Sequence, residues 1–224
     1  EPSSQVASCS IPNGAHTCVA YHADTAALKQ RLGLSPDTRL ALFVGRAAPE
    51  KNLPVLVDAF ARLGAGHHLL LVGPGMPAVR QANVTVRSRY VRGAALSRLL
   101  ASADVFVHAG DCETFGLVVL EAMASGTPVV VSDRGALPEL VGPGTGVVAA
   151  APTPDAMATA VRDLFAQDRD SMGAQARQWA QVRWAWTIQI NQLRQTYEQL
   201  VGIRSAIASD GYAPFQQGAD GGAA

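Results

Sequence analysis

The stretch DVFVHAGDCETFGLVVLEAMASGTPVVVS, residues 104–132, decides the fold of this chain. It opens with a short apolar run over 104–108, passes through a turn containing Gly110 into a longer apolar stretch over 116–124, and ends in a second short run over 128–132. Short apolar runs bounded by turn residues are typical of buried strands, and the longer stretch between them is predicted to be a helix. Strand, glycine turn and helix together form the repeating unit of a parallel sheet.

The same alternation continues on both sides of this stretch. We predict further strands over 39–44, 67–72, 84–87 and 145–149, and helices over 25–32, 52–63 (capped by Asn52), 94–101, 137–141, 154–166 and 171–200. The predicted fold class is therefore α/β, a Rossmann-like six-stranded parallel sheet with helices on both faces. Such sheets bind ligands outside the carboxyl ends of their strands, and the glycine-rich turns at 45, 73–75, 110 and 135 lie at that edge.

The composition indicates a sizeable core and no charged face. Of the 224 residues, 48% are hydrophobic, and the formal net charge is zero, which gives no sign of nucleic acid as a partner. No apolar run approaches the roughly 18 residues that a membrane span needs, and we find no signal sequence. Three cysteines exclude a fully paired disulfide framework and favour free thiols. We therefore expect a cytoplasmic protein, with peripheral attachment at the inner face of the membrane left open.

We divide the chain into three segments. Residues 1–22, rich in Ser, Pro and small residues, are predicted to be a linker-like N-terminal segment, in which Ser10-Ile-Pro-Asn-Gly14 is an extended piece entering a turn. Residues 23–201 are predicted to form the α/β domain with its C-terminal helices. Residues 202–224, rich in Gly and Ala, are predicted to be a disordered tail.

Two glutamates, in the stretch Glu113-Thr-Phe-Gly-Leu-Val-Val-Leu-Glu121, have almost only apolar or small neighbours. A carboxylate in a helix that otherwise looks buried is costly unless a partner satisfies it. We interpret both as acceptors for the hydroxyls of a ligand, and Gly116 as the residue that opens the helix N-terminus to a phosphate. An alternative, in which Glu121 pairs with a buried arginine and Glu113 only caps the helix, stays open on these residues alone.

Two cations follow the predicted strand over 39–44. In Gly45-Arg-Ala-Ala-Pro-Glu-Lys-Asn52, a glycine lets the backbone turn, and Arg46 and Lys51 precede the next helix. This arrangement can hold a diphosphate between a guanidinium and an ammonium without a metal. A solvated loop is the alternative for such a pair taken by itself.

The weaker patterns support neither a metal nor a cofactor. Asp168-Arg-Asp170 has a spacing found in metal sites, but it lies between two predicted helices, where a helix cap explains it. Gly73-Pro-Gly75 lacks the third glycine and the acidic residue of a dinucleotide fingerprint. Cys112 has no evident base near it in sequence. A zinc site is also disfavoured, because no common finger has the spacing of Cys9, His16, Cys18 and His22.

Taken in order, these segments resemble the donor-binding, C-terminal half of a GT-B-fold glycosyltransferase of the retaining family 4, from about Ser10 to Leu200. The resemblance depends on five segments in the right sequence order. The most specific of them is the segment that begins at Glu113, contains both glutamates and ends at Val130. The segments are Ile11-Pro-Asn-Gly14, Val44 to Asn52, Leu69 to Gly73, Ala103 to His108, and Glu113 to Val130 with Gly135-Ala-Leu-Pro-Glu-Leu-Val141 after it.

The resemblance implies a role for each matching residue. Arg46 and Lys51 match the cations that hold the donor diphosphate and stabilise the leaving nucleotide. Glu113 matches the first glutamate of the E-x7-E motif, which contacts the donor sugar, and Glu121 matches the second, which contacts the ribose hydroxyls. The catalytic residues implied are thus Arg46, Lys51 and Glu113, without a metal or cofactor.

The resemblance also implies the rest of the donor pocket. The backbone amides of Gly116 and Leu117 match those at the pyrophosphate, and Arg89 and Tyr90 fall where the family lines the nucleobase pocket. The full set of donor-binding residues implied is Gly45, Arg46, Lys51, Gly73, Arg89, Tyr90, Glu113, Phe115, Gly116, Leu117 and Glu121.

The implied function is a retaining, hexosyltransferase-like glycosyltransferase that uses a UDP- or GDP-sugar and an unidentified sugar, lipid or small-molecule acceptor. The family's N-terminal Rossmann-like half, in the native chain or in a second polypeptide, is not part of this sequence, so we expect little transfer by this chain alone. Ala15-His16 replaces the usual Val-Asp, and the helix with Trp184 and Trp186 resembles the segment that packs on that half. The alternative is a non-catalytic nucleotide-sugar-binding or assembly subunit, or a truncated fragment.

Overall fold

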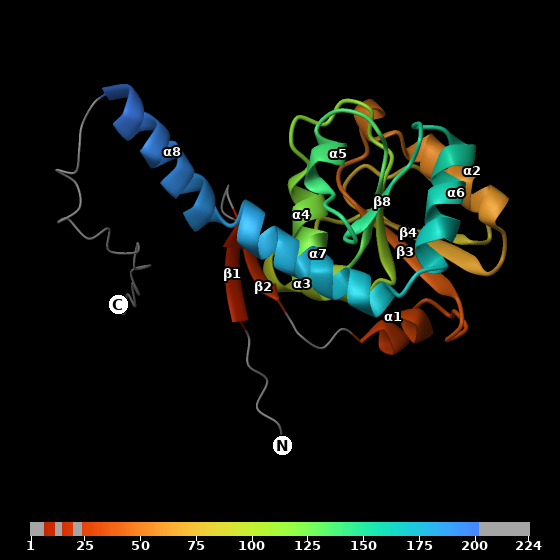
Figure 1. Ribbon diagram of the computed structural model, residues 1–224. Coiled ribbons are helices and arrows are strands. Elements are labelled where there is room, and N and C mark those ends of the chain that lie inside the picture. Colours follow the sequence, from red (N-terminus) through yellow and green to blue (C-terminus); the bar gives the residue numbers. More distant parts are fainter. Residues whose placement is uncertain (1–6, 12–14, 20–23, 202–224) are drawn as a thin grey trace, which may run out of the picture.

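A computed structural model describes residues 7–11, 15–19 and 24–201. Within that part of the chain, six parallel strands form one sheet in the order β5-β4-β3-β6-β7-β8, which confirms the predicted fold class (Figure 1). The strands are β3 Arg39–Val44, β4 His67–Val72, β5 Val84–Arg87, β6 Val105–His108, β7 Val129–Val131 and β8 Gly146–Val148.

The strand order places a topological switch point in the middle of the sheet. The chain enters at β3 and moves outward through β4 to β5, then returns to form β6 on the other side of β3 and moves outward to β8. The loops that follow β3 and β6 leave the sheet at this switch point. In open parallel sheets, the crevice between two such loops is where ligands bind.

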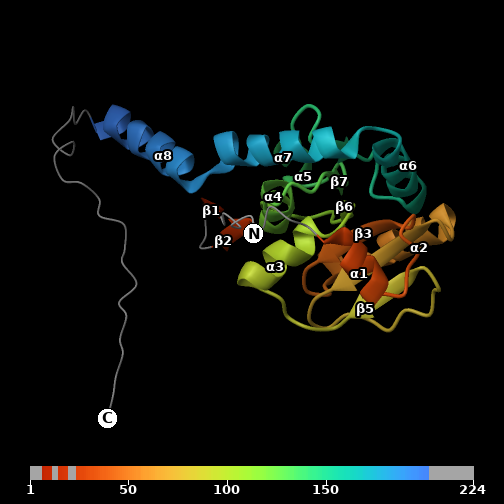
Figure 2. The same ribbon diagram turned by 90° about the horizontal axis from the view of Figure 1, so that it is seen from below.

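Helices cover both faces of the sheet (Figures 1 and 2). One face is covered by α2 and α6, and the other by α1, α3, α4 and α7. The bounds are α1 Thr25–Arg31, the 3₁₀ turn η1 Pro49–Lys51, α2 Leu53–Leu63, α3 Gly93–Ala101, α4 Leu117–Ala124, α5 Leu137–Leu140, α6 Pro154–Phe165, α7 Arg169–Trp184 and α8 Trp186–Val201.

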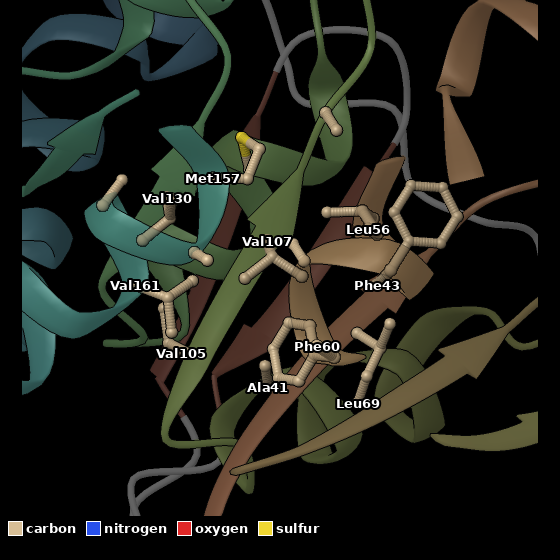
Figure 3. Close-up of a cluster of buried hydrophobic side chains, with 14 of the residues drawn as sticks. Ala41, Phe43, Leu56, Phe60, Leu69, Val105, Val107, Val130, Met157 and Val161 are labelled. Carbon is tan, nitrogen blue, oxygen red and sulfur yellow. The ribbon is translucent and has the colours of Figure 1, made fainter. Parts of the chain in front are cut away.

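The central strands are buried on both sides because successive side chains point to opposite faces. In β3, Leu40 and Leu42 join the cluster under α4 and α7, whereas Ala41 and Phe43 join the cluster under α2 and α6. Figure 3 shows this second cluster, with Phe43 beside Leu56 of α2. Continuous apolar runs, rather than alternating ones, are the sequence pattern that such strands require.

The prediction of one helix over 171–200 is wrong. The structure has two helices, α7 and α8, separated at Ala185, whose extended backbone (ψ 140°) ends α7. α7 packs on α4 through small residues: a Cβ on Gly173 would lie 2.2 Å from the carbonyl oxygen of Gly126. α8 runs away from the sheet in both views (Figures 1 and 2). α7 is thus fixed to the domain by packing that α8 does not share.

Two short antiparallel strands, β1 Ala7–Ile11 and β2 Ala15–Val19, form a separate sheet in the segment that we predicted to be linker-like. β2 lies against α3. The turn predicted at 12–14, His22 and the tail 202–224 lie outside the described residues. In the described part of the chain, no helix is both long enough and apolar enough to cross a membrane.

Candidate functional site

The site begins with two glycines that end neighbouring strands. Gly45 follows β3 and donates its N–H to the Val72 carbonyl at 3.0 Å. Gly73 follows β4 with φ +153°, and a Cβ on it would lie 1.7 Å from the carbonyl oxygen of Gly45. Any side chain at Gly73 would therefore push the two strand ends apart. Gly45 and Gly73, both predicted to bind the donor, thus allow the ends of β3 and β4 to lie close together.

The loop between β3 and α2 carries the two predicted cations. Arg46 is largely exposed, with 65% of its side chain accessible, and it pairs with the Glu50 carboxylate. Asn52 occupies the N-cap position of α2, as predicted, but its backbone is left-handed (φ +54°) and its side chain makes no capping hydrogen bond. The side-chain amide instead contacts the Asp111 carboxylate at 3.5 Å.

Lys51 and Glu113 join the two loops across the crevice. The Lys51 ammonium pairs with Oε1 of Glu113, and the two side chains are only 16% and 12% exposed. Burial is the main cause that lowers the pKa of Lys51; Glu50 opposes this shift and Arg46 adds to it. The Asp111 N–H also donates to the Glu50 carbonyl at 3.2 Å. The loops after β3 and β6, separated by some 60 residues of sequence, thus form one unit.

The backbone around Glu113 is held by the turn that follows β7. Ala136 donates its N–H to the Glu113 carbonyl at 2.9 Å. A Cβ on Gly135 would lie 2.6 Å from the same carbonyl oxygen, so the turn needs a glycine there. This contact explains why the Gly135-to-Val141 segment accompanies the glutamate stretch in sequence.

The N-terminus of α4 opens at Gly116. Its φ of +88° is a left-handed conformation, and a Cβ would lie 2.9 Å from Leu137. Gly116 is the N-cap residue, and no side chain caps the helix. The alternative in which Glu113 caps α4 is therefore wrong, and the first N–H groups of the helix remain suited to an anion.

Glu121 lies on the one half-exposed stripe of α4. Leu117 and Val118 share this stripe, one turn nearer the N-terminus, while the other faces of the helix are buried. Burial raises the pKa of Glu121 to about 7. Among the described residues no hydrogen bond or ion pair reaches its carboxylate, so the alternative in which Glu121 pairs with a buried arginine does not occur there. A desolvated carboxylate without a partner is typical of a ligand site.

Three of the predicted donor residues lie further from this cluster. Arg89 and Tyr90 are in the loop between β5 and α3, and the Tyr90 side chain is 73% exposed. Arg89 lines a groove of about 400 Å³ between α1 and α3. The Phe115 ring stands edge-on to Trp184, 5.6 Å between centroids. No contact in the described structure joins these side chains to Lys51 or Glu113, and their roles stay predictions.

Sequence reasoning missed two residues of the site. His108, the last residue of β6, is fully buried, with Nε2 3.3 Å from Oε1 of Glu113. Ser132, just after β7, donates its hydroxyl to the Gly110 carbonyl. The only signal available was their position, since each directly follows or ends an apolar run at the carboxyl edge of the predicted sheet.

Asp168, by contrast, is a helix cap as predicted. Its carboxylate accepts from the N–H groups of Asp170 and Ser171 at the start of α7, at 3.1 and 3.2 Å.

The chain matches solved structures of GT-B glycosyltransferases. The chain matches sucrose-phosphate synthase from Thermosynechococcus elongatus with a TM-score of 0.67 and 29% identity, over 82% of this chain and 51% of that chain. It matches Anabaena HepE in complex with UDP-glucose with a TM-score of 0.65 and 25% identity, over 80% and 53%. Fold and site together define a Rossmann-like domain of the GT-B glycosyltransferase class.

The family follows from the sequence comparisons. Residues 38–167 match the model of the family Glycosyl transferases group 1. The chain is 40% identical over 181 residues to a GDP-mannose-dependent alpha-mannosyltransferase of Mycolicibacterium smegmatis, covering 78% of this chain and 47% of the relative. It is 34% identical to a D-inositol 3-phosphate glycosyltransferase of Mycolicibacterium gilvum, covering 74% and 41%. The chain belongs to the glycosyl transferases group 1 family, and it spans about half the length of these relatives.

Proposed function

We propose that this chain is the donor-binding domain of a glycosyltransferase and that it binds a nucleoside diphosphate sugar in the crevice between the loops after β3 and β6. The observation that carries the proposal is Glu121, a partly buried carboxylate without a described partner on the helix whose uncapped N-terminus opens at Gly116. Hydroxyl groups of a ligand would satisfy this carboxylate, and the ribose is the group that the family motif assigns to it.

The cations at the site are already paired, which suggests how a diphosphate binds. Arg46 is paired with Glu50, and Lys51 with Glu113. A diphosphate carries more charge than either carboxylate and can take both cations at once. On this proposal, donor binding transfers Lys51 from Glu113 to the diphosphate, and Glu113 becomes free to accept hydroxyls of the donor sugar.

The same exchange would support catalysis. Cleavage of the anomeric C–O bond places negative charge on the departing diphosphate and positive charge on the sugar. Arg46, Lys51 and the N-terminus of α4 would stabilise the growing negative charge more strongly than the ground state, which is the requirement for rate enhancement. We propose transfer with retention of the anomeric configuration, as in the family 4 enzymes that the chain resembles.

The relatives suggest which donor to test first. The 40% identical mycobacterial relative is named for GDP-mannose, whereas the Anabaena structure, at 25% identity, contains UDP-glucose. We therefore propose a GDP- or UDP-sugar, with GDP-mannose as the first candidate. We also retain a cytoplasmic location as part of this proposal.

We further propose that the acceptor binds to a second Rossmann-like half, and α8 supports this. Trp186, Ile190, Leu193 and Tyr197 are 43%, 41%, 52% and 59% exposed, and their spacing puts them along one side of the helix. An apolar stripe of this kind on a helix that extends away from its own domain is suited to packing on another domain.

Calorimetric titration of the chain with GDP, UDP, GDP-mannose and UDP-glucose tests the proposal. At least one nucleotide should bind, and Glu121→Ala and Arg46→Ala should each weaken that binding at least tenfold, as expected when a hydrogen bond to a charged group is lost. Arg194→Ala, an exposed change in α8, is the control and should bind like the wild type. Absence of binding to every nucleotide would exclude the donor-domain function. Transfer at ordinary enzyme rates by this chain alone would instead exclude the need for a second half.

A further inference from the structure

His108 ends β6, five residues before Glu113 in the sequence. Its side chain is fully buried, and its ring packs on Phe43 with 5.5 Å between centroids. A buried imidazole has two nitrogens to satisfy, so the partner of each nitrogen indicates what the ring does.

The surroundings of Nδ1 determine where the ring proton lies. Nδ1 accepts a hydrogen bond from the Gly110 N–H at 3.0 Å. Gly110 is fixed in turn by the Ser132 hydroxyl, and a Cβ on it would lie 2.5 Å from Cε1 of the ring. Because Nδ1 is an acceptor, the proton of the neutral ring must be on Nε2.

The Nε2–H is directed at the site. Nε2 lies 3.3 Å from Oε1 of Glu113, the oxygen that also receives the Lys51 ammonium. This contact is not aligned as a hydrogen bond, and within the described residues the buried Nε2–H has no other acceptor. Burial, reinforced by Lys51, lowers the pKa of His108 to about 3. The ring is therefore a neutral, unsatisfied donor beside the carboxylate.

We propose that His108 is a positioning residue that fixes the Glu113 carboxylate for the donor sugar. When a diphosphate removes the Lys51 ammonium, Oε1 of Glu113 can accept the Nε2–H, and Oε2 is then presented to the sugar hydroxyls. The inference rests on the proposed donor function, and it adds the group that selects one orientation of the carboxylate. His108 acts through Glu113 and does not itself contact the donor.

Two substitutions of His108 by neutral amides test the roles of the two ring nitrogens separately. In His108→Asn the amide oxygen can still accept from Gly110, but nothing reaches Glu113. In His108→Gln the longer amide brings an N–H close to the position of Nε2. We expect His108→Asn to weaken GDP-mannose binding about tenfold while GDP binding changes less than twofold, because only the sugar depends on the hydrogen bond to the charged Glu113 carboxylate. His108→Gln should restore most of the GDP-mannose affinity.

The matched control is His68→Asn. His68 is also buried and bonded, through Nε2, to Thr85 at 2.8 Å, but it lies in β4 away from Glu113. The His68→Asn substitution should leave the ratio of GDP affinity to GDP-mannose affinity unchanged. Equal losses for GDP and GDP-mannose in His108→Asn, or no recovery in His108→Gln, would overturn the positioning role. A wild-type chain that binds no nucleotide would instead overturn the donor function and, with it, the sugar part of this inference.

Nitrogen-15 NMR of the wild-type chain tests the ring without any variant having to fold. The His108 signals, assigned by their absence in His108→Asn or by through-bond transfer from the backbone, should show the neutral Nε2–H tautomer from pH 8 to about pH 5. Glu113→Gln should shift the Nε2 signal. An Nδ1–H tautomer, or protonation near the ordinary histidine pKa of 6.5, would contradict the proposal.

Discussion

Asp104 and Glu121 are both carboxylates that are largely removed from solvent, and the fold treats them in opposite ways. Asp104 lies at the amino end of β6, 10% exposed, and accepts from the Leu40 N–H at 2.7 Å, from Lys29 at 2.9 Å and from Arg169 at 2.8 Å. Glu121 lies in the second turn of α4, the helix that begins at the opposite, carboxyl edge of the sheet, and the described structure provides its carboxylate with no partner. The chain is thus able to satisfy a buried carboxylate completely, and at Glu121 it does not.

The comparison separates a structural charge from a ligand-binding one. A satisfied carboxylate joins elements: Asp104 connects α1, β3 and α7. An unsatisfied one destabilises the free protein and becomes favourable only when a ligand provides the missing donors. Replacing each carboxylate with its neutral amide should therefore change stability in opposite directions.

The largest effect is expected for Asp104→Asn. The change leaves Lys29, 11% exposed, and Arg169 without their carboxylate, and breaking a buried ion pair on one side costs about 3–5 kcal/mol. Urea denaturation at pH 7 measures the loss. The exposed pair of Arg62 and Asp155 supplies the control, since Asp155→Asn should cost less than about 1 kcal/mol. A loss of equal size in both variants would remove the distinction between the two kinds of carboxylate.

Glu121→Gln is expected to stabilise the free protein. Its folded-state pKa of about 7 lies above the ordinary value of 4.5, so the folded state binds more protons than the unfolded state between these pH values. The stability linked to the neutral acid is complete below about pH 4.5 and is lost as the pH rises through about 7. At pH 8 the amide, which cannot ionise, should be more stable than the wild type by about 3 kcal/mol, while its affinity for the donor falls.

The check is the difference in unfolding free energy between Glu121→Gln and the wild type from pH 4.5 to 8. Only the difference isolates Glu121, because His108, with its pKa lowered to about 3, also makes stability decrease as the pH falls below 6.5. The difference should be near zero at pH 4.5 and largest at pH 8. A constant difference over this range would show that the carboxylate is not desolvated.

Much of the fold follows from local sequence. The bounds of β3, β4 and β5 are those predicted, because each is a short apolar run that ends at a glycine or a charged residue. The break between α7 and α8 was missed because neither glycine nor proline marks Ala185, and the helix ends there although the local pattern could continue. The position of α7 on the domain depends on the close contact of Gly173 with Gly126. Sequence periodicity does not identify this contact.

The site was predictable in its residues but not in its connections. Glu113 and Glu121 could be recognised because a carboxylate is out of place among apolar neighbours. The pairing of Lys51 with Glu113 and the support of Glu113 by Gly135 depend on loops after three different strands. Those loops meet only because the strand order reverses between β3 and β6, which sets distances that no local pattern records.

The smallest stability effect belongs to the most exposed charge of the site. Arg46 is 65% exposed, so Arg46→Ala should change the unfolding free energy by less than about 0.5 kcal/mol, even though it is expected to reduce nucleotide affinity at least tenfold. Arg62→Ala removes an exposed arginine outside the site and should match it in stability while leaving affinity unchanged. A destabilisation by Arg46→Ala well above 1 kcal/mol would mean that Arg46 is a structural charge like Asp104. With the expected result, Arg46 is a ligand-binding charge like Glu121, because both then bind the ligand and contribute nothing favourable to folding.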